Sequence, residues 1–263
     1  MINKFFLSKY ASFLPTKLVK KIIKKKRIYF VKTDEIKLPK NNYPFKIKTK
    51  ELVFFYKKFK KKPNTKPIST FPKMKELLQK IFKKKEFIFF DYGGQYIDNF
   101  LYLKKNFPKI KYYYLDNKYN NRQMKRFVKD KKIKDFKVIN NIYELKNNRI
   151  DFLNFGSVLQ YIKNYKNILC FLENNKPKYI LISAMTLFQG KSESFICKQF
   201  NVWPQINYCY FFNKKYLDKL FGKYNYKKVF NRKNHTDKRI NFSNIEDKEN
   251  HFFQYLDIFY KKK

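Results

Sequence analysis

Short apolar runs alternate with stretches of helical periodicity between residues 87 and 184, and this alternation constrains the fold more than any other feature. The runs are apolar at both odd and even positions, so each predicted strand is buried on both faces. Such strands, separated by helices, are typical of a parallel sheet that is covered on both sides. The predicted strands are FIFFD (87–91), IKYYYLD (110–116), FKVI (136–139), IDFLNF (150–155) and KYILISA (178–184), and the predicted helices between them span 95–107, 120–130, 157–162 and 165–175.

The C-terminal part of the chain predicts elements that close one edge of this sheet. Residues 214–224 have helical periodicity, with apolar side chains on one face. Residues 225–231 and 251–260 are rich in aromatic residues, which favours strands. We expect these two strands to pair with each other. The predicted fold class is therefore α/β, a doubly wound, mostly parallel sheet with an antiparallel C-terminal edge.

The first 70 residues lack this alternation. They combine lysine runs with five prolines and one amphipathic helical pattern, at residues 16–26. The character of the chain changes near residue 71, where a helix over 71–85 begins. We therefore divide the chain into a basic N-terminal extension that is helical or irregular, residues 1–70, and a Rossmann-like domain, residues 71–263.

The formal net charge of the 263 residues is +42 at pH 7. Clustered cations bind phosphates by releasing counterions, so this charge raises the question of a nucleic-acid partner. Only six of the 62 basic residues are arginine, which is the residue favoured for bidentate contacts with phosphates and bases. No helix-turn-helix, zinc-ligand or RNP-like pattern accompanies the lysines. We expect that the protein binds no nucleic acid specifically. Two explanations of the charge remain: an AT-rich coding sequence, or selection for an anionic partner.

The three cysteines and two histidines lack the spacing of metal ligands, so no metal site is predicted. Reduced thiols in a cytoplasmic protein are the expected state of the cysteines. The chain has no apolar run of the roughly 18 residues that a membrane helix needs. At the N-terminus, Lys4 and Lys9 interrupt the apolar residues, which argues against a signal peptide.

Two of the five glycines of the chain stand together after the end of the first predicted strand, which is unusual in a sequence so poor in glycine. Gly93 and Gly94 stand together between Asp91, where the strand ends, and the next helix. In a doubly wound sheet this turn lies at the ligand-binding crevice, and glycine lets the backbone approach a ligand closely. The second strand ends at Asp116, whose carboxylate can accept hydrogen bonds from the hydroxyls of a ribose. The pattern predicts a nucleoside-containing cofactor; the alternative is a tight turn followed by an ordinary loop.

Several longer segments resemble one family of proteins. In chain order they are FDYGGQY, YYYLDN, IDFLNFGSVLQYIKN, PKYILISAMTLFQ, WPQINYCYFFNKKYLDKL and YNYKKVF. They resemble a family of Rossmann-like methyltransferases that is associated with bacterial surface-polysaccharide biosynthesis. The resemblance runs from about residue 71 to the C-terminus and implies S-adenosylmethionine (SAM) as the cofactor. Gln95 and Tyr96 depart from it, because the family carries further glycine after the pair.

The resemblance also implies roles for individual residues near the ends of the predicted strands. The residues that it places at the cofactor are Asp91, Gly93 and Gly94 at the methionine end, Asp116 and Asn117 at the ribose, Asn140, Asn141 and Ile142 beside the adenine, and Asn154, Phe155, Gly156 and Ser157 at the border of the transfer site.

Methyl transfer is an in-line displacement in which alignment supplies much of the rate, so no obligatory catalytic motif marks the site. The candidates for contact with the reacting groups are Ser157, Gln160, Tyr161 and His251. For the first two a structural role competes, because S-x-x-Q is a capping box for a helix that begins at Val158. The residues predicted to contact substrate, with core packing as the alternative, are Trp203, Asn207, Tyr208 and Tyr210.

The predicted function is SAM-dependent methylation of a saccharide or another cell-envelope precursor, with a small-molecule or lipid-linked saccharide as acceptor. The resemblance alone supplies this substrate class. The amphipathic pattern at 16–26 suits a helix on an anionic membrane, so we expect a cytoplasmic protein with peripheral contact at the inner membrane surface. The alternative is a non-catalytic Rossmann-like protein that binds nucleic acid or anionic lipid through its lysine-rich surface.

Overall fold

The computed structural model describes most of the chain from residue 71 onward and a short segment before it. The described residues are 28–34, 37–38, 71–83, 85–94, 97–145, 148–202, 205–237, 240–242, 245 and 252–263. The amphipathic pattern predicted at 16–26 lies outside them. None of the described helices is long and apolar enough to cross a membrane.

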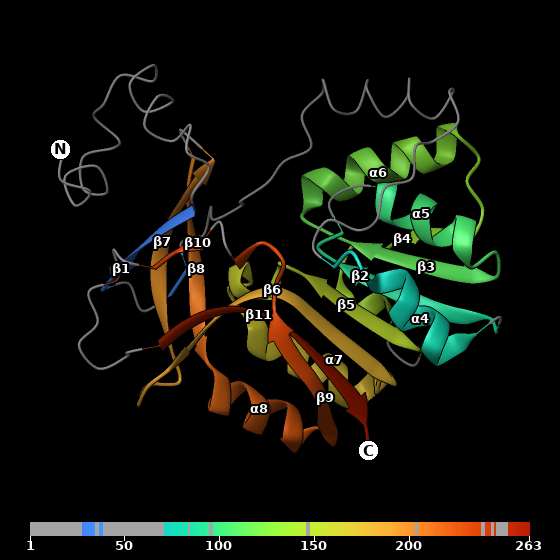
Figure 1. Ribbon diagram of the computed structural model, residues 1–263. Helices are drawn as coiled ribbons and strands as arrows, with labels where there is room; N and C mark the ends of the chain where they lie inside the picture. Colours follow the sequence, from blue (N-terminus) through green and yellow to red (C-terminus); the bar gives the residue numbers. More distant parts are fainter. Residues whose placement is uncertain are drawn as a thin grey trace.

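Five parallel strands form one half of the sheet, as the alternating pattern predicted (Figure 1). Four of them are buried over most of their length, which explains the continuous apolar runs, whereas in the edge strand only Phe136 is buried. In spatial order they are β4 (Phe136–Val138), β3 (Ile110–Leu115), β2 (Phe87–Tyr92), β5 (Phe152–Gly156) and β6 (Tyr179–Gln189).

The antiparallel C-terminal edge is also confirmed. β11 (Phe252–Lys262) lies between β6 and β9 (Tyr226–Lys233) and is antiparallel to both. The last strand of the chain is therefore an interior strand of the sheet. The pairing of β11 with β6 shifts register between Leu256 and Ile258, beside Ala184, which has a positive φ of 54°.

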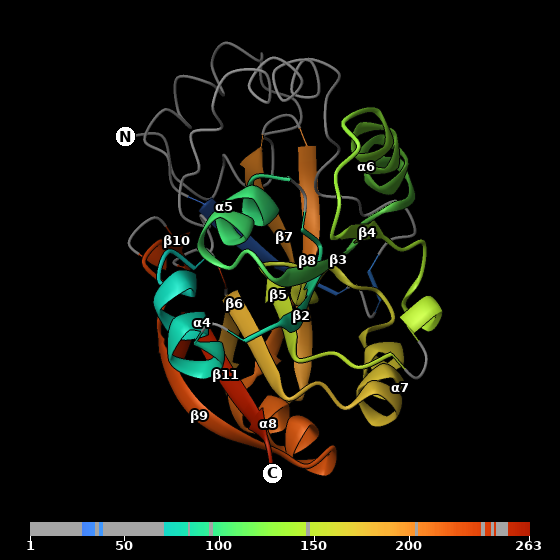
Figure 2. The same ribbon diagram turned by 90° about the vertical axis from the view of Figure 1, so that its right-hand side faces the viewer.

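Helices cover both faces of this sheet and produce two separate cores (Figure 2). One core lies under α4, α5 and α6, and its centre is a set of stacked aromatic rings such as Phe89, Tyr112 and Phe152. The other lies under α7 and α8 and is largely aliphatic. The helices are α4 (Met74–Phe82), α5 (Asp98–Asn106), α6 (Lys118–Asp130), α7 (Tyr165–Asn175) and α8 (Lys214–Lys223), with the 3₁₀ turns η2 (Ile142–Leu145) and η3 (Leu159–Tyr161).

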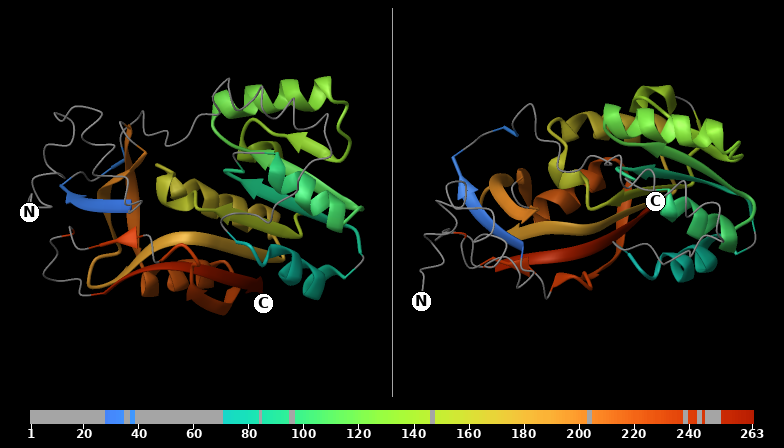
Figure 3. Two further views of the ribbon diagram at one scale, coloured as in Figure 1. Left: turned by 45° about the horizontal axis from the view of Figure 1, so that its top comes forward. Right: turned by 90° about the horizontal axis from the view of Figure 1, so that it is seen from above.

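A second group of strands extends the sheet from the carboxyl half of β6 (Figure 3). β7 (Ser194–Val202) and β8 (Gln205–Asn213) form a hairpin, and β8 joins β6 through two residue pairs, Leu187 with Phe212 and Phe188 with Asn213. β1 (Ile28–Thr33) pairs antiparallel with β7, and β10 (Ile240–Asn241) pairs with β1. We call β1, β7, β8 and β10 the inserted sheet.

The inserted sheet differs from the sequence-based expectation in two places. Residues 28–33 belong to the extension that was expected to be helical or irregular, yet they form β1. Residues 194–213 form a hairpin for which the sequence suggested no regular element. The division of the chain at residue 71 stays a prediction.

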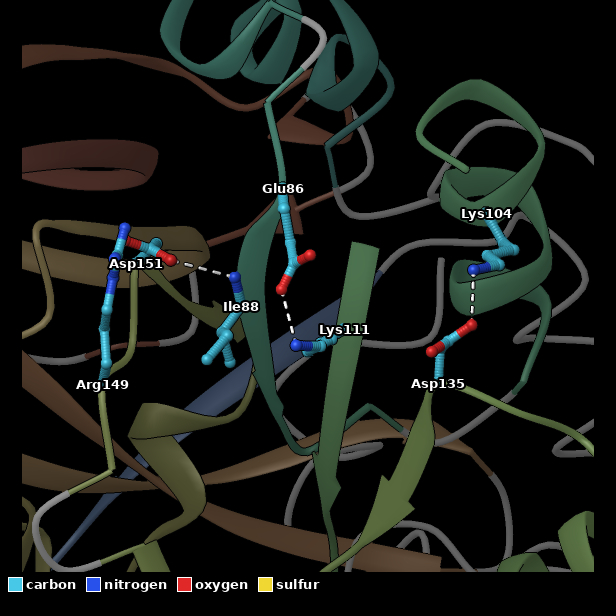
Figure 4. A network of polar contacts seen from close by, with 7 residues as sticks. All are labelled: Glu86, Ile88, Lys104, Lys111, Asp135, Arg149 and Asp151. Carbon is cyan, nitrogen blue, oxygen red and sulfur yellow. Dashed lines mark hydrogen bonds and ion pairs between the residues drawn. The ribbon is translucent and has the colours of Figure 1, made fainter. Parts of the chain in front are cut away.

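A buried carboxylate joins the amino ends of two central strands (Figure 4). Asp151 precedes β5, and its side chain is 3% exposed. Its Oδ2 accepts the N–H of Ile88 in β2 at 3.0 Å, and its own N–H donates to the carbonyl of Ile88 at 3.1 Å. Its Oδ1 lies 2.9 Å from Arg149 Nη2 and 3.3 Å from Lys178 Nζ. β2 and β5, which carry the predicted site at their carboxyl ends, are thus fixed at their opposite ends.

Candidate functional site

The turn after β2 has the close packing that only glycine permits. Gly93 has a positive φ of 76°, and its N–H donates to the carbonyl of Leu115 at the end of β3 at 2.6 Å. A Cβ on Gly93 would lie 2.4 Å from Cγ2 of Val158, and a Cβ on Gly94 would lie 2.7 Å from Oδ2 of Asp91. The two glycines therefore let the chain pass directly over Asp91 and against the segment that follows β5. Gln95 and Tyr96 lie outside the described residues.

Asp91 is buried beneath this turn and is held by three donors. Its Oδ2 accepts from Asn99 Nδ2 at 3.1 Å and from the hydroxyl of Tyr112, and its Oδ1 accepts from Asn154 Nδ2 at 2.8 Å. Burial raises the pKa of Asp91, and the hydrogen bonds from Tyr112, Asn154 and Asn99 oppose that rise. The carboxylate forms the floor of the turn, and its partners come from β3, α5 and β5.

Asn154, in β5 beside Asp91, has a side-chain oxygen without a hydrogen-bond partner among the described residues. An ionised carboxylate only accepts hydrogen bonds, so the amide nitrogen of Asn154 faces Asp91 and its Oδ1 points away. This Oδ1 is buried and has no hydrogen-bond partner among the described residues. Buried polar atoms are nearly always paired, so the orphaned oxygen marks a place for a hydrogen-bond donor or a cation.

Asp116 lies at the tip of β3, as predicted, within a cluster of amides. Its Oδ1 accepts from the backbone N–H of Asn117 at 2.6 Å, and its Oδ2 accepts from Asn120 Nδ2 at 3.0 Å. Asn117 in turn begins α6, because its side chain accepts the N–H of Asn120 at 3.0 Å. Burial raises the pKa of Tyr92 to about 12, and the nearby Asp116 adds to this rise. The Asp116 carboxylate is thus oriented beside the end of β2.

The tip of β4 is tied to the tip of β3 through a residue that the sequence did not single out. Asn121 in α6 accepts the N–H of Asp116 at 2.8 Å and donates to the carbonyl of Ile139 at 2.9 Å. Beyond Ile139, the exposed Asn140 donates to Glu144 Oε1 at 2.7 Å. Hydrogen bonds therefore hold the ends of β3 and β4, where the adenine is predicted to bind, in fixed positions.

The other two residues predicted at the adenine belong to η2 and its start. The side chain of Asn141 accepts the N–H of Tyr143 at 2.9 Å, which starts this 3₁₀ turn. Ile142 is 8% exposed and packs into the core beneath it. Of the three predicted residues, Asn140 and Asn141 are exposed, whereas Ile142 is mostly covered.

The segment after β5 does not form the predicted helix over 157–162, and the capping box is wrong. η3 has three residues, and no side chain caps it. Ser157 has a positive φ of 57°, and its N–H donates to the carbonyl of Ser183 in β6 at 2.8 Å. This bond continues the pairing of β5 with β6 to Ser157, whose positive φ is not that of a right-handed helix. Gln160 instead donates from Nε2 to Ser157 Oγ at 3.3 Å and to the carbonyl of Ala184 at 3.2 Å.

Two neighbours of Ser157 differ in their surroundings. Phe155 is fully buried in the core, with its ring 5.5 Å from that of Tyr92, so its side chain packs and does not face a ligand. Gly156 is partly exposed. The backbone of residues 156–158 therefore reaches the surface next to the glycine turn.

The predicted substrate contacts fall in the inserted sheet. Asn207 is 1% exposed and lies opposite Gln199 in the hairpin, and Tyr208 is half-buried. Tyr210 is 7% exposed and packs its ring against Tyr165, at 5.5 Å, so it serves the core. Tyr161 donates its hydroxyl to Gln199 Oε1 at 2.5 Å, which connects η3 to β7. Trp203 and His251 lie outside the described residues.

Three further residues near this segment gave no recognisable signal in the sequence. Tyr255 of β11 places its hydroxyl 3.3 Å from Ser157 Oγ. Ser183 and Gln199 are buried polar residues inside strands, where a sequence pattern shows only that a strand continues. Their positions depend on pairings between strands that are far apart in the chain.

The chain was compared with known proteins. No family model and no curated protein matches it. Among solved structures it is similar to a 1,6-didemethyltoxoflavin-N1-methyltransferase of Burkholderia thailandensis, crystallised with 1,6-didemethyltoxoflavin and S-adenosylhomocysteine (SAH). The TM-score is 0.50 at 12% sequence identity, covering 81% of this chain and 87% of that one. A SAM-dependent methyltransferase of Clostridium acetobutylicum ATCC 824 is also similar, with a TM-score of 0.47, 12% identity, and coverage of 81% and 98%.

The likeness to the Burkholderia enzyme shows the class of fold. The order of the strands and the antiparallel position of β11 define the mixed α/β fold of the class I methyltransferases. Membership of the polysaccharide-associated family that the sequence resembles is not shown, since no family model matches.

The raised pKa of Asp91 predicts a pH dependence of stability. A buried carboxyl whose pKa is raised binds its proton more tightly in the folded than in the unfolded chain, where the pKa is 3.8. The free energy of unfolding that Asp91 contributes therefore falls as the pH rises from 3.8 through the raised pKa, by at most about 1.4 kcal/mol per pH unit. Urea unfolding at a series of pH values gives the free energy of unfolding of the wild type and of Asp91→Asn. The difference between the two free energies should fall with pH at this slope. Parallel curves across the acidic range would contradict it.

Proposed function

We propose that this protein is a SAM-dependent methyltransferase. The observation that carries the proposal is the glycine turn with the buried Asp91 beneath it and the unpaired Asn154 Oδ1 beside it. These groups lie at the carboxyl ends of β2 and β5, where a doubly wound sheet binds its ligand. The Burkholderia enzyme that shares the fold was crystallised with SAH, the demethylated form of SAM.

The residues present fit the cofactor. The absence of a Cβ on Gly94 lets the turn lie directly on Asp91, at the carboxyl end of β2 where a sheet of this kind binds its ligand. The unpaired Asn154 Oδ1 suits the ammonium of a methionine moiety, and the Asp116 carboxylate suits the hydroxyls of a ribose. Asn140 and Asn141 offer polar atoms on the adenine side. When bound, SAM supplies a methyl group on a positively charged sulfur.

The roles of the chain's own residues follow from their hydrogen bonds. Asp91 is a positioning residue, because it fixes the amide of Asn154 so that Oδ1 points away from the Asp91 carboxylate. Asn121 holds the tips of β3 and β4 at a constant separation, which keeps Asp116 and the adenine side in register. Preorganised groups of this kind contribute to rate by aligning the reacting atoms.

We further propose a small-molecule or lipid-linked saccharide, or another cell-envelope precursor, as the acceptor. The support is the sequence resemblance, together with the amphipathic pattern at 16–26 for a cytoplasmic enzyme in contact with the inner membrane surface. Transfer of a labelled methyl group from SAM into a lipid extract, rather than into the aqueous fraction, would support the lipid-linked form.

Calorimetric titration with SAM and SAH tests the proposed function directly. We expect the wild type to bind both, and Asp116→Asn to weaken binding by about 1–3 kcal/mol, the range for a hydrogen bond to a charged group. Asp135→Asn is the matched control, since Asp135 lies before β4 at the other end of the strands and pairs with Lys104 at the surface. It should bind as the wild type does. A wild-type protein that binds neither compound would overturn the proposal.

A further inference from the structure

Two further buried polar atoms lack partners, and both lie beside the proposed cofactor site. Besides Asn154 Oδ1, the described residues with such an atom are Gln160, through Oε1, and Ser183, through Oγ. Gln160 is 1% exposed and Ser183 is fully buried. An unpaired buried hydroxyl or amide oxygen costs about 1–3 kcal/mol, so two of them on residues that both contact Ser157 point to a ligand that would pair with them.

The two residues are neighbours across the backbone of β6. Gln160 donates from Nε2 to the carbonyl of Ala184 at 3.2 Å, and Ser157 donates its N–H to the carbonyl of Ser183 at 2.8 Å. In the pairing of β5 with β6, Ser183 lies opposite Gly156, which has no side chain to cover the serine hydroxyl. Both residues thus contact the partly exposed segment 156–158.

Ser157 connects this cluster to β11. Its Oγ accepts from Gln160 Nε2 and lies 3.3 Å from the hydroxyl of Tyr255, and either hydroxyl of this pair can donate to the other. Of the two unpaired groups, Gln160 Oε1 only accepts a hydrogen bond, whereas the Ser183 hydroxyl can both donate and accept. The cluster therefore offers a ligand one donor and two acceptors.

The groups of the cluster select for a neutral ligand. Ser157, Gln160, Ser183 and Tyr255 are all uncharged near neutral pH. Two acids lie near them, and both are engaged. Asp237 Oδ1 accepts the backbone N–H of Tyr255 at 3.3 Å. In Asp257 of β11, Oδ1 accepts from Ala184 N at 3.0 Å and from Asn234, and Oδ2 lies 3.4 Å from Arg232 Nε. A cationic ligand would find no free carboxylate among these groups, and an anionic ligand would face the amide oxygen of Gln160.

We propose that Ser157, Gln160 and Ser183 bind a hydroxyl group of a neutral ligand, a group that both donates and accepts a hydrogen bond. The side chain of Val158 packs against Gly93, so this site adjoins the glycine turn. The inference rests on the proposed function in one respect, because it makes the bound molecule the methyl acceptor. Tyr161 and Gln199 are positioning residues, since their hydrogen bond fixes η3 against the inserted sheet.

The experiment compares a buried hydroxyl without a partner with one that has a partner. Ser183→Ala removes the unpaired Oγ, whereas Tyr226→Phe removes a hydroxyl that donates to the carbonyl of Pro177 at 2.8 Å at the opposite end of β6. The probe is cis-cyclohexane-1,2-diol, observed by saturation-transfer NMR. We expect Ser183→Ala to lose the diol signal while its melting temperature stays the same or rises. Tyr226→Phe should melt at a lower temperature and keep the signal.

Three outcomes would overturn the inference. The first is a diol signal that survives in Ser183→Ala, and the second is the absence of a diol signal from the wild type. The third is a fall in the melting temperature of Ser183→Ala as large as that of Tyr226→Phe, which would give the hydroxyl a structural role. Cyclohexane-1,2-diamine and cyclohexane-1,2-dicarboxylate, at about 0.15 M salt to screen the charged surface, should show no signal that depends on Ser183. A signal of that kind would overturn the neutral class.

Titration with SAH separates this inference from the proposed function. If the protein binds SAH but not the diol, the result supports the proposed function and contradicts the hydroxyl site. If it binds the diol through Ser183 but does not bind SAH, the result supports the hydroxyl site and contradicts SAM as the methyl donor. In Ser183→Ala the affinity for SAH should equal that of the wild type, because the residues proposed for the cofactor are untouched.

Discussion

We expect the Gly94→Val variant to lose its affinity for SAM and SAH by a factor of 100 or more, about 3 kcal/mol. A Cβ at this position would lie 2.7 Å from Asp91 Oδ2 and 2.9 Å from Cδ2 of Tyr114. Both side chains are buried, and Asp91 is held by its three hydrogen-bond donors, so neither can move aside. The backbone of the turn must shift instead, and the proposed site shifts with it. Calorimetric titration measures the loss.

The same substitution should cost stability, and the two effects have to be separated. Overpacking a core position typically costs about 1–3 kcal/mol, so the variant should remain folded and its affinity can be measured. Gly222→Ala is the matched control, because Gly222 lies in α8 and a Cβ there would meet nothing within 4 Å. Replacing a helical glycine with alanine should raise stability by up to about 1 kcal/mol and leave SAH binding unchanged. Wild-type affinity in folded Gly94→Val would place the cofactor elsewhere.

The second large effect is expected from Asp151→Ala, which should lower the free energy of unfolding by about 2–3 kcal/mol. The change removes a charge-assisted hydrogen bond and leaves the N–H of Ile88 without its acceptor. Arg149 and Lys178 are 67% and 57% exposed, so their loss of a partner adds little. For a chain of this size we expect a fall in melting temperature of roughly 4–12 °C.

Two controls define the origin of this effect. Asp151→Asn keeps an oxygen for the N–H of Ile88 and removes only the charge, so its loss should be smaller. Glu86→Gln breaks an exposed ion pair with Lys111, 2.6 Å long, and should change stability by less than about 1 kcal/mol (Figure 4). An equal loss in Asp151→Asn and Asp151→Ala would assign the effect to charge. Asp151→Ala as stable as the wild type would contradict the prediction.

The parallel half of the fold could be predicted because all of its strands except the edge strand β4 are buried over most of their length. That burial produces continuous apolar runs, and each of the five predicted runs contains or overlaps the strand found there. The glycine turn and Asp116 were found for a related reason, since they follow directly from the ends of those runs. Which atoms of Asp91 and Asn154 are paired could not be predicted. That depends on the contact between β2 and β5, which are 63 residues apart in the chain at this point.

The inserted sheet could not be predicted, for physical reasons. β7 reads SFICKQFNV and mixes polar with apolar residues, and its partner β1 lies more than 150 residues earlier in the chain. Pairing over such a distance leaves no local pattern. The prediction of a helix over 157–162, where η3 is found, failed for a different reason. The backbone hydrogen bond from Ser157 to Ser183 overrides the local preference for a helix. The same bond brings together the hydroxyl site, which therefore also had no sequence signature.

The interior position of β11 has a consequence for how the chain folds. β6 and β9 become neighbours of a common strand only when residues 252–262 dock between them. Until then each strand presents an unpaired edge, and such edges associate readily with other chains. Tyr255 and Asp257 arrive with β11, so the polar cluster beside Ser157 is incomplete until β11 has docked. A ribosome that pauses before residue 252 would therefore hold a nascent chain in which Ser157 lacks its contact with Tyr255 and β6 lacks its antiparallel partner.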